Sequence, residues 1–152
     1  LGVSNIIWLN KGIKGDDTHG HVDDICRFVN PETVVLALAD EADQENYHQL
    51  QENWERLQDA KLENGRPIQV IKLPLPDPLY FGGYRLPASY ANFYIANHKV
   101  LVPTFNDAKD RLALGILQEL FPTRQVVGIN CVDLIWGFGA IHCLTSEQPA
   151  SN

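Results

Sequence analysis

Two similar stretches decide the fold of this chain: VVLALAD at residues 34–40 and VLVPTFN at residues 100–106. Each is an apolar run of strand character that leads into a helix start, and the second lies 66 residues after the first. At the same offset, residues 28–29 (FV) match residues 94–95 (YI). A supersecondary unit repeated at long period is typical of a radial or stacked array, in which each unit packs on its neighbour. Chance similarity of two α/β units is the alternative.

Hydrophobic periodicity predicts the same order of elements in both copies: strand, strand, helix, strand. In the two helices the apolar residues recur at steps of three and four, the pattern of an amphipathic helix. The first copy is predicted to contain strands at residues 22–29, 33–39 and 68–73 and a helix at residues 44–62; the second, strands at residues 91–96, 99–105 and 125–129 and a helix at residues 107–121.

Three segments lie outside these two copies. Residues 6–9 (IIWL) are predicted as a short buried strand, and residues 141–144 (IHCL) as a last strand that would open a third, unfinished copy. Residues 74–87 are rich in proline and glycine and are predicted as a long irregular loop. Such loops are often lids or binding loops, and a passive surface excursion is the alternative.

The composition bounds the class of protein. The chain has 152 residues, enough for one core, and we expect a single domain over residues 1–152. A net charge of −7 argues against a nucleic-acid or anionic-membrane partner and suits a cationic substrate. Three widely spaced cysteines, the lack of a signal region and the lack of a long apolar run favour the cytoplasm. No methionine is present, as expected of a processed or truncated product, although a chance deficit is the alternative.

The stretch GDDTHGHVDD at residues 15–24 holds two imidazoles and four carboxylates, which are costly to place against a core unless something binds them. It is therefore either a solvated loop or a site. Side chains two apart in an extended segment point the same way. We therefore expect His21 and Asp23 to share one face at the start of the strand predicted at residues 22–29.

One interpretation is a metal site. Residues 18–23 (THGHVD) resemble part of the metal motif of the metallo-β-lactamase superfamily, so His19, His21 and Asp23 would bind zinc or iron in a metal-dependent hydrolase. That motif continues with histidine, whereas this chain has Asp24. Further ligands would have to come from histidines without supporting context, His48, His98 and His142.

Another interpretation makes Cys143 a nucleophile. The cysteine follows a glycine-rich bend, and a thiolate needs a nearby proton carrier, which His21 could supply across the fold. On a strand, His142 would face away from Cys143. A buried core cysteine is the alternative.

Several motifs resemble agmatine deiminases, close relatives of the bacterial, Porphyromonas-type peptidylarginine deiminases. The resemblance runs in order along the chain: WL at residues 8–9, KGIKGDDT at residues 11–18, GHVD at residues 20–23, ASYANFYIAN at residues 88–97, VVG at residues 126–128, IHCLT at residues 141–145 and QP at residues 148–149. It implies a pentein-type α/β propeller of ββαβ units. This chain would be only its C-terminal portion, about two repeats plus part of a third.

The resemblance also implies roles for four residues. Cys143 would be the nucleophile, His21 the general acid/base, and Asp23 a carboxylate that holds the guanidinium group; Asp17 would contact the substrate at its far amine. Asp16, His19 and Asp24 are expected to serve structure or solvation. No metal or organic cofactor is implied.

The implied reaction is hydrolytic deimination of a small guanidino compound, in first place agmatine to N-carbamoylputrescine and ammonia, a step towards putrescine. Alternatives are a peptidyl-arginine or arginine deiminase, the metal-dependent hydrolase, and an inactive binding domain. The expected partners are the cationic guanidino substrate, the N-terminal part of the same enzyme and, as an option, further copies in a homo-oligomer. The family usually has Gly-Gly-Asn before Ile-His-Cys. Phe138 and Ala140 depart from that pattern, which puts the local hydrogen bonding of this loop in question.

Overall fold

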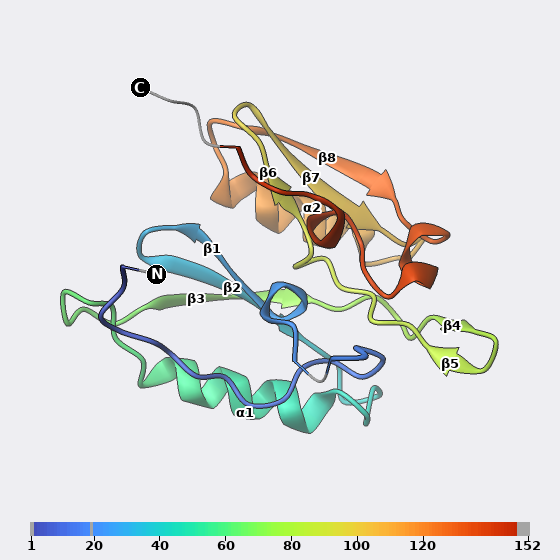
Figure 1. The fold of residues 1–152 in the computed structure, drawn as a ribbon, viewed down its shortest axis with the longest axis horizontal. Coiled ribbons are helices and arrows are strands. Elements are labelled where there is room, and N and C mark those ends of the chain that lie inside the picture. Colours follow the sequence, from blue (N-terminus) through green and yellow to red (C-terminus); the bar gives the residue numbers. More distant parts are fainter. Residues whose placement is uncertain (1, 19, 149–152) are drawn as a thin grey trace.

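Two units of the same topology stand one above the other in this protein (Figure 1). The computed structural model describes residues 2–18 and 20–148. Each unit is a three-stranded sheet with one helix. The first unit contains β1 (Cys26–Asn30), β2 (Thr33–Leu38), α1 (Tyr47–Gln58) and β3 (Gln69–Pro74); the second contains β6 (Tyr94–Ile95), β7 (Lys99–Thr104), α2 (Asp110–Leu120) and β8 (Gln125–Asn130).

The strand pairing confirms the repeat. In both sheets the middle strand pairs antiparallel with the first strand and parallel with the third. The parallel register is also the same, because Thr33 faces Gln69 in one sheet and Lys99 faces Gln125 in the other. Parallel neighbours need a crossover connection, and the amphipathic helix of each unit supplies it.

Both helices begin later than predicted, because hydrogen-bonded turns precede them; before α1, the carbonyl of Asp43 accepts the N–H groups of Asn46 (3.1 Å) and Tyr47 (2.9 Å). The carboxylate of Asp110 accepts hydrogen bonds from the N–H groups of Phe105 (3.1 Å) and Asp107 (3.2 Å), so α2 starts only at Asp110. Before α1, the amide oxygen of Asn46 accepts the N–H of Lys14 (2.7 Å). The amphipathic pattern itself is confirmed, since Leu50 and Leu57 of α1 are buried.

Four predicted strand segments are wrong. Residues 91–93, predicted as the start of a strand, form the turn and connection before β6. Residues 6–9 are not a strand: Ile7 and Leu9 pack on the first unit, Ile6 and Trp8 are exposed, and the N–H of the following Asn10 donates to Asn53 of α1 (2.6 Å). Residues 22–24 form a 3₁₀ turn, η1 (Val22–Asp24). Residues 142–144 form another, η3 (His142–Leu144), so a strand that opens a third copy is not observed among the described residues.

The segment predicted as an irregular loop at residues 74–87 contains a short hairpin. Strands β4 (Tyr80–Phe81) and β5 (Tyr84–Arg85) are joined by Gly82 and Gly83, whose φ angles of +57° and +85° suit a two-residue hairpin turn. The ring of Phe81 stacks on Trp136 in the second half of the chain, with centroids 4.0 Å apart. Arg85 pairs with Asp43 before α1. The hairpin therefore touches both units.

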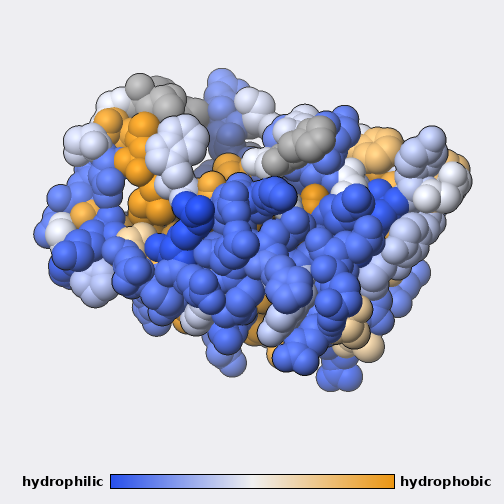
Figure 2. Space-filling view, turned by 90° about the horizontal axis from the view of Figure 1, so that it is seen from below, coloured by the Kyte–Doolittle hydropathy of each residue, from blue (hydrophilic) through white to orange (hydrophobic). Residues whose placement is uncertain are grey.

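The units also share apolar packing. Val29, Val35 and Leu73 of the first sheet lie in one buried cluster with Val100 and Val102 of the second. A smaller cluster lies between the first sheet and α1. Figure 2 shows the face on the α1 side, which is mostly hydrophilic, with apolar surface gathered towards one end. Within the described residues, neither helix has the length and apolar character needed to cross a membrane.

Arg27 joins the two units through its side chain. Its guanidinium donates hydrogen bonds to the carbonyl oxygens of Phe93 (2.8 Å) and Ala91 (3.3 Å) and lies 4.8 Å from the centre of the Phe93 ring. The planar guanidinium donates two hydrogen bonds and also stacks on a ring, which the ammonium group of a lysine cannot do. The contact links β1 directly to the segment that precedes β6.

We therefore expect Arg27→Lys to lower the free energy of unfolding by about 1–2 kcal/mol, because the stacking and one carbonyl hydrogen bond are lost while the charge stays. Chemical denaturation measures this. Arg66→Lys, which makes the same change in an exposed pair with Glu32, should shift stability by less than about 0.5 kcal/mol. Equal effects of the two changes would contradict the assigned role of Arg27.

Candidate active site

Three segments far apart in the chain meet at one point. They are η1, the turn that precedes β6, and η3, which bring together Asp23, Asn92, His142 and Cys143. The first segment belongs to the first unit, the second to the second unit, and the third follows the last strand. This cluster contains two of the residues predicted from the sequence, Cys143 and Asp23.

One oxygen of Asp23, Oδ2, lies at the centre of the cluster. It is 2.8 Å from Nδ1 of His142, 3.1 Å from the amide nitrogen of Asn92 and 3.3 Å from Sγ of Cys143. Burial alone would raise the pKa of Asp23, but the hydrogen bonds from His142 and Cys143 outweigh it and lower the pKa below the ordinary value. Asp23 is therefore an anion held by donors.

Cys143 is exposed, in contrast to a core cysteine. Partial burial of its sulfur raises the pKa of the thiol, a hydrogen bond from Asn92 opposes this, and the charges of Asp23 and Asp24 add to the rise. The unliganded protein therefore holds a neutral thiol, and a cation bound beside it would favour the thiolate.

His142 lies beside Cys143 in the network, which corrects the prediction that it faces away. That prediction assumed a strand at residues 141–144. In η3 the backbone turns instead, because the N–H of His142 donates to both the side-chain oxygen (2.9 Å) and the carbonyl (3.1 Å) of Asn92. As a result His142 and Cys143 approach the same oxygen of Asp23.

His21 and Asp17 lie apart from this cluster. Because residues 22–24 form a 3₁₀ turn, the expectation that His21 and Asp23 share a strand face is wrong. The imidazole of His21 is half exposed, with Nδ1 3.7 Å from the Asp16 carboxylate, and no hydrogen bond joins it to Cys143 within the described residues. Asp17 is exposed.

Asp16 has the structural role that was expected. Its carboxylate accepts hydrogen bonds from the N–H and hydroxyl of Thr18 (2.9 and 2.7 Å) and from the N–H groups of Gly20 (2.9 Å) and His21 (2.7 Å). These bonds shape the loop that carries His21. Burial raises the pKa of Asp16, but these backbone and hydroxyl donors prevail and lower it.

Asp24 is structural but not solvated. It is buried, its Oδ1 accepts the amide of Asn92 (2.8 Å), and its Oδ2 has no hydrogen-bond partner among the described residues. Burial and the nearby charge of Asp23 raise the pKa of Asp24 to about 7. A carboxyl group that is half protonated near neutral pH therefore lies directly beside the ionised Asp23.

Asn92 is the residue that sequence reasoning missed. In the sequence it is one residue of the motif at residues 88–97, and nothing there assigns it a role. In the structure it is fully buried and contacts all other members of the cluster. The available signal was a single amide within an apolar segment predicted as a strand, since a buried amide must find hydrogen-bond partners.

Two members of the predicted metal trio, His21 and Asp23, have other neighbours in the structure. His19 lies outside the described residues, His21 neighbours Asp16, and Asp23 binds His142. Two other groups bring possible ligand atoms within 4.8 Å of one another: Asp16, His21 and Asp24, and Asp23, Asp24 and Cys143. In the first, the Asp16 oxygens already accept the loop donors described above.

The bend before Cys143 is tightly constrained. A Cβ atom at Gly139 would lie 2.7 Å from the Cβ of Cys143, so only glycine fits there. Phe138 adopts a left-handed φ of +60°, a backbone conformation that residues other than glycine rarely take. Ala140 is fully buried. The two departures from the family pattern therefore lie in the bend directly before η3, one with a strained backbone and one in the core.

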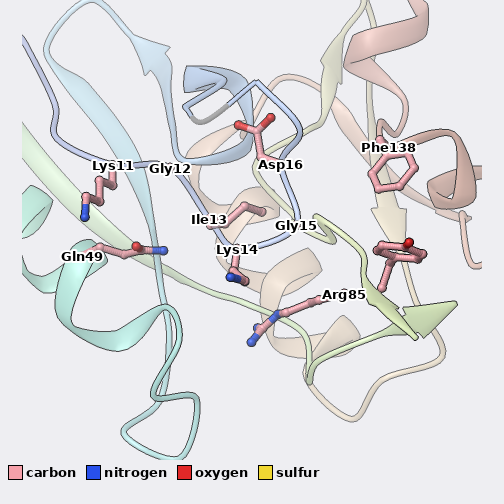
Figure 3. A pocket seen from close by; sticks show the side chains of 10 residues that line it. Lys11, Gly12, Ile13, Lys14, Gly15, Asp16, Gln49, Arg85 and Phe138 are labelled. Atoms are coloured by element: carbon pink, nitrogen blue, oxygen red, sulfur yellow. The ribbon is translucent and has the colours of Figure 1, made fainter. Parts of the chain in front are cut away.

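One cavity lies beside the loop of Asp16, and another reaches the cluster. The first, of about 420 Å³, is lined by residues 11–16, Gln49, Tyr84, Arg85 and Phe138; Figure 3 shows Lys11 and Gln49 at one end and Phe138 at the other. The second, of about 440 Å³, reaches Asp23 and His142 and is otherwise mainly apolar, with Ile7, Leu9 and Phe28 among its lining residues.

The family model of Porphyromonas-type peptidyl-arginine deiminases matches residues 1–149. A Legionella pneumophila protein that is provisionally named agmatine deiminase is 42% identical over 153 residues, which cover 100% of this chain and 44% of that protein. The chain thus spans less than half the length of this curated relative.

Solved structures agree. A crystal structure from Porphyromonas gingivalis, provisionally described as an arginine deiminase, superposes with a TM-score of 0.94 at 41% identity, covering 98% of this chain and 44% of that one. Agmatine deiminase of Enterococcus faecalis superposes with a TM-score of 0.89 at 33% identity, covering 97% and 45%. The α/β fold of this chain is therefore the fold of the matching parts of these structures.

The raised pKa of Asp24 makes a prediction about stability. The folded state keeps the proton up to about pH 7, whereas the unfolded carboxyl releases it near its ordinary value of 3.8. Stability from this group is thus present below about pH 4 and is lost as the pH rises through 7. The free energy of unfolding of Asp24→Asn, minus that of the unchanged protein, should therefore be larger at pH 8 than at pH 4, by on the order of 3 kcal/mol.

Urea denaturation at both pH values measures that difference, and Asp59→Asn, the same change at an exposed position, is the matched control. A pH-independent effect of Asp24→Asn would mean that Asp24 is ionised in the folded protein.

Proposed function

Because the chain belongs to the Porphyromonas-type peptidyl-arginine deiminase family, we propose that it forms part of a hydrolytic deiminase of a small guanidino compound. Agmatine is the first candidate, with N-carbamoylputrescine and ammonia as products. The observation that carries the proposal is the pair of Cys143 and Asp23, with a thiol 3.3 Å from an ionised carboxylate. The name of the E. faecalis relative supports agmatine over other guanidino compounds.

Asp23 binds the substrate in this proposal. A carboxylate can accept two parallel N–H groups from a planar guanidinium, and its low pKa keeps it ionised for that purpose. The substrate must take the place that His142 and the thiol now occupy at Oδ2. Its positive charge beside Cys143 then favours loss of the thiol proton.

The chemistry has two halves. The thiolate of Cys143 attacks the guanidinium carbon, forming a C–S bond, and the tetrahedral adduct releases ammonia after a nitrogen accepts a proton from His21. Water, deprotonated by His21, then attacks the thiouronium carbon; the C–S bond breaks and returns the thiolate, leaving the ureido product. The balance is one guanidinium and one water converted to one urea group and one ammonium ion.

His21 must come closer to the sulfur than it lies in the unliganded protein. Its imidazole is half exposed, with Asp16 at 3.7 Å and Asp24 within 4.8 Å, so part of the ring borders solvent and has room to move. Hydrogen bonds of catalytic groups are often long in unliganded proteins and shorten when substrate binds. Asp17, also exposed on this loop, is the proposed contact for the far amine of the substrate.

We further propose that the chain is the C-terminal portion of a pentein-type propeller. The two ββαβ units of the chain support this proposal. The mainly apolar cavity beside Asp23 also supports it, because a further part of the propeller would cover this apolar surface. Exposed Ile6, Trp8 and Phe28 lie on the segments that line or adjoin this cavity. Three free cysteines support a reducing, cytoplasmic location.

Cys143→Ala should abolish ammonia release from agmatine, by at least about a thousandfold, because no other group can form the covalent intermediate. Peptidyl-arginine and free arginine are assayed in parallel to identify the substrate. Cys131→Ala, which removes a buried thiol outside the cluster, should retain activity and is the matched control.

Activity that survives Cys143→Ala but disappears with a chelator would replace this mechanism by a metal-dependent hydrolase. An unmodified protein that binds guanidino compounds but releases no ammonia would be a binding domain instead.

A further inference from the structure

Asn92 sits in a rigid part of the fold. It is fully buried, and so are its neighbours Tyr90 and Phe93. The hydroxyl of Tyr90 donates to Asp110 at the start of α2 (2.7 Å), and the carbonyl of Phe93 accepts the guanidinium of Arg27 (2.8 Å). The backbone at Asn92 is therefore anchored to both units, and its side chain has little freedom.

The oxygen and the nitrogen of the Asn92 amide have different hydrogen-bond partners. Its oxygen accepts the N–H of His142 (2.9 Å) and the N–H of Cys143 (3.4 Å). Its nitrogen donates towards Asp24 Oδ1 (2.8 Å), Cys143 Sγ (3.0 Å) and Asp23 Oδ2 (3.1 Å). Backbone N–H groups can only donate and an ionised carboxylate can only accept, so the orientation of the amide is fixed by its partners.

The amide nitrogen has two hydrogens but three acceptors, so the acceptors compete. A thiolate is a stronger acceptor than a thiol, and its formation draws a hydrogen of Asn92 towards sulfur. The other ionisable groups around the sulfur are Asp23 and Asp24 from η1, Arg27 from β1, and His142 and Glu147 from η3 and the segment after it. The two aspartates oppose a negative sulfur, and the Asn92 amide is the neutral donor that directly contacts it.

We infer that Asn92 is a positioning residue that holds the Cys143 turn against the Asp23 turn and favours the thiolate through its amide donor. The catalytic benefit of this role rests on the proposed deiminase function, whereas the effect of Asn92 on the thiol does not. A purely structural amide would change stability when replaced and would leave the reactivity of the thiol unchanged.

Asn92→Asp tests the role of the amide nitrogen separately from that of the amide oxygen. The variant keeps the size and the acceptor for the backbone N–H groups, but it loses the donor and adds negative charge. We expect the rate of Cys143 alkylation by iodoacetamide at pH 7 to fall at least about tenfold, and its pH midpoint to rise by about one unit or more. Asn92→Ala, which loses the donor without adding charge, should shift the midpoint in the same direction.

Two controls accompany these variants. Cys143→Ala gives the background alkylation of Cys26 and Cys131. Asn53→Asp makes the same change at another fully buried asparagine, whose amide contacts Asn10 and Lys11 instead of the sulfur. It should lower the thermal unfolding midpoint without moving the alkylation midpoint.

Folded Asn92 variants with an unchanged alkylation midpoint would overturn the inference. If both variants unfold, the unmodified protein provides the test. The NMR signal of the Asn92 side-chain amide should change over the same pH range in which Cys143 becomes reactive towards iodoacetamide. This change should be absent in Cys143→Ser. An amide resonance that does not respond to Cys143 would overturn the inference equally.

Alkylation needs no substrate, so the result stands apart from the deiminase assay. A protein that never deiminates agmatine but shows the shift contradicts the proposed function alone. An active deiminase without the shift contradicts only the role of Asn92. In an active enzyme, the acidic limb of the kcat/KM profile should move to higher pH with the alkylation midpoint.

Discussion

The charge of Asp23 is the constraint on which the site depends. A carboxylate taken partly out of water is unfavourable unless donors surround it. Here those donors come from Asn92, in the second unit, and from His142 and Cys143, which follow the last strand. The anion is therefore stable only when the two units and the C-terminal turn are packed together. Folding of the domain and assembly of the site are, in this sense, the same event. Burial of Asp24 and the neighbouring charge of Asp23 raise the pKa of Asp24 as a further result of this packing.

The repeat explains where the site lies. Asp24 is followed within two residues by β1, and Asn92 is followed within two residues by β6. Equivalent ends of two similar units thus face one another, and η3 adds a third segment after the last strand. Cross-links between the units keep this arrangement: Arg27 binds the turn before β6, and Lys109 beside α2 pairs with Asp40 and Asp77 of the first half (2.8 Å each). A repeated scaffold has positioned loops whose sequences have nothing in common.

The sequence predicted what depends on local periodicity. Both helices, the strands around residues 33–38, 69–74, 99–104 and 125–130, and the 66-residue repeat are confirmed. It failed where tertiary hydrogen bonds decide the backbone: a helix side chain, Asn53, holds the segment after residues 6–9, and Asn92 turns η3 away from a strand. For the site, the resemblance indicated Cys143 and Asp23, which the structure brings together. A lone amide in an apolar segment could have indicated that Asn92 is buried and hydrogen-bonded, but not with what, because its partners lie 50 to 69 residues away along the chain.

The neutral state of the exposed Cys143 thiol has a consequence for the lifetime of the protein in the cell. Peroxide and electrophilic metabolites react with thiolates, and a thiol whose pKa is raised by burial and by two neighbouring aspartates reacts slowly. The thiol therefore resists oxidative damage although its sulfur is exposed. A cation beside the sulfur would oppose the charges of the two aspartates, so the reactivity of this thiol depends on the charges around it and not on its exposure alone.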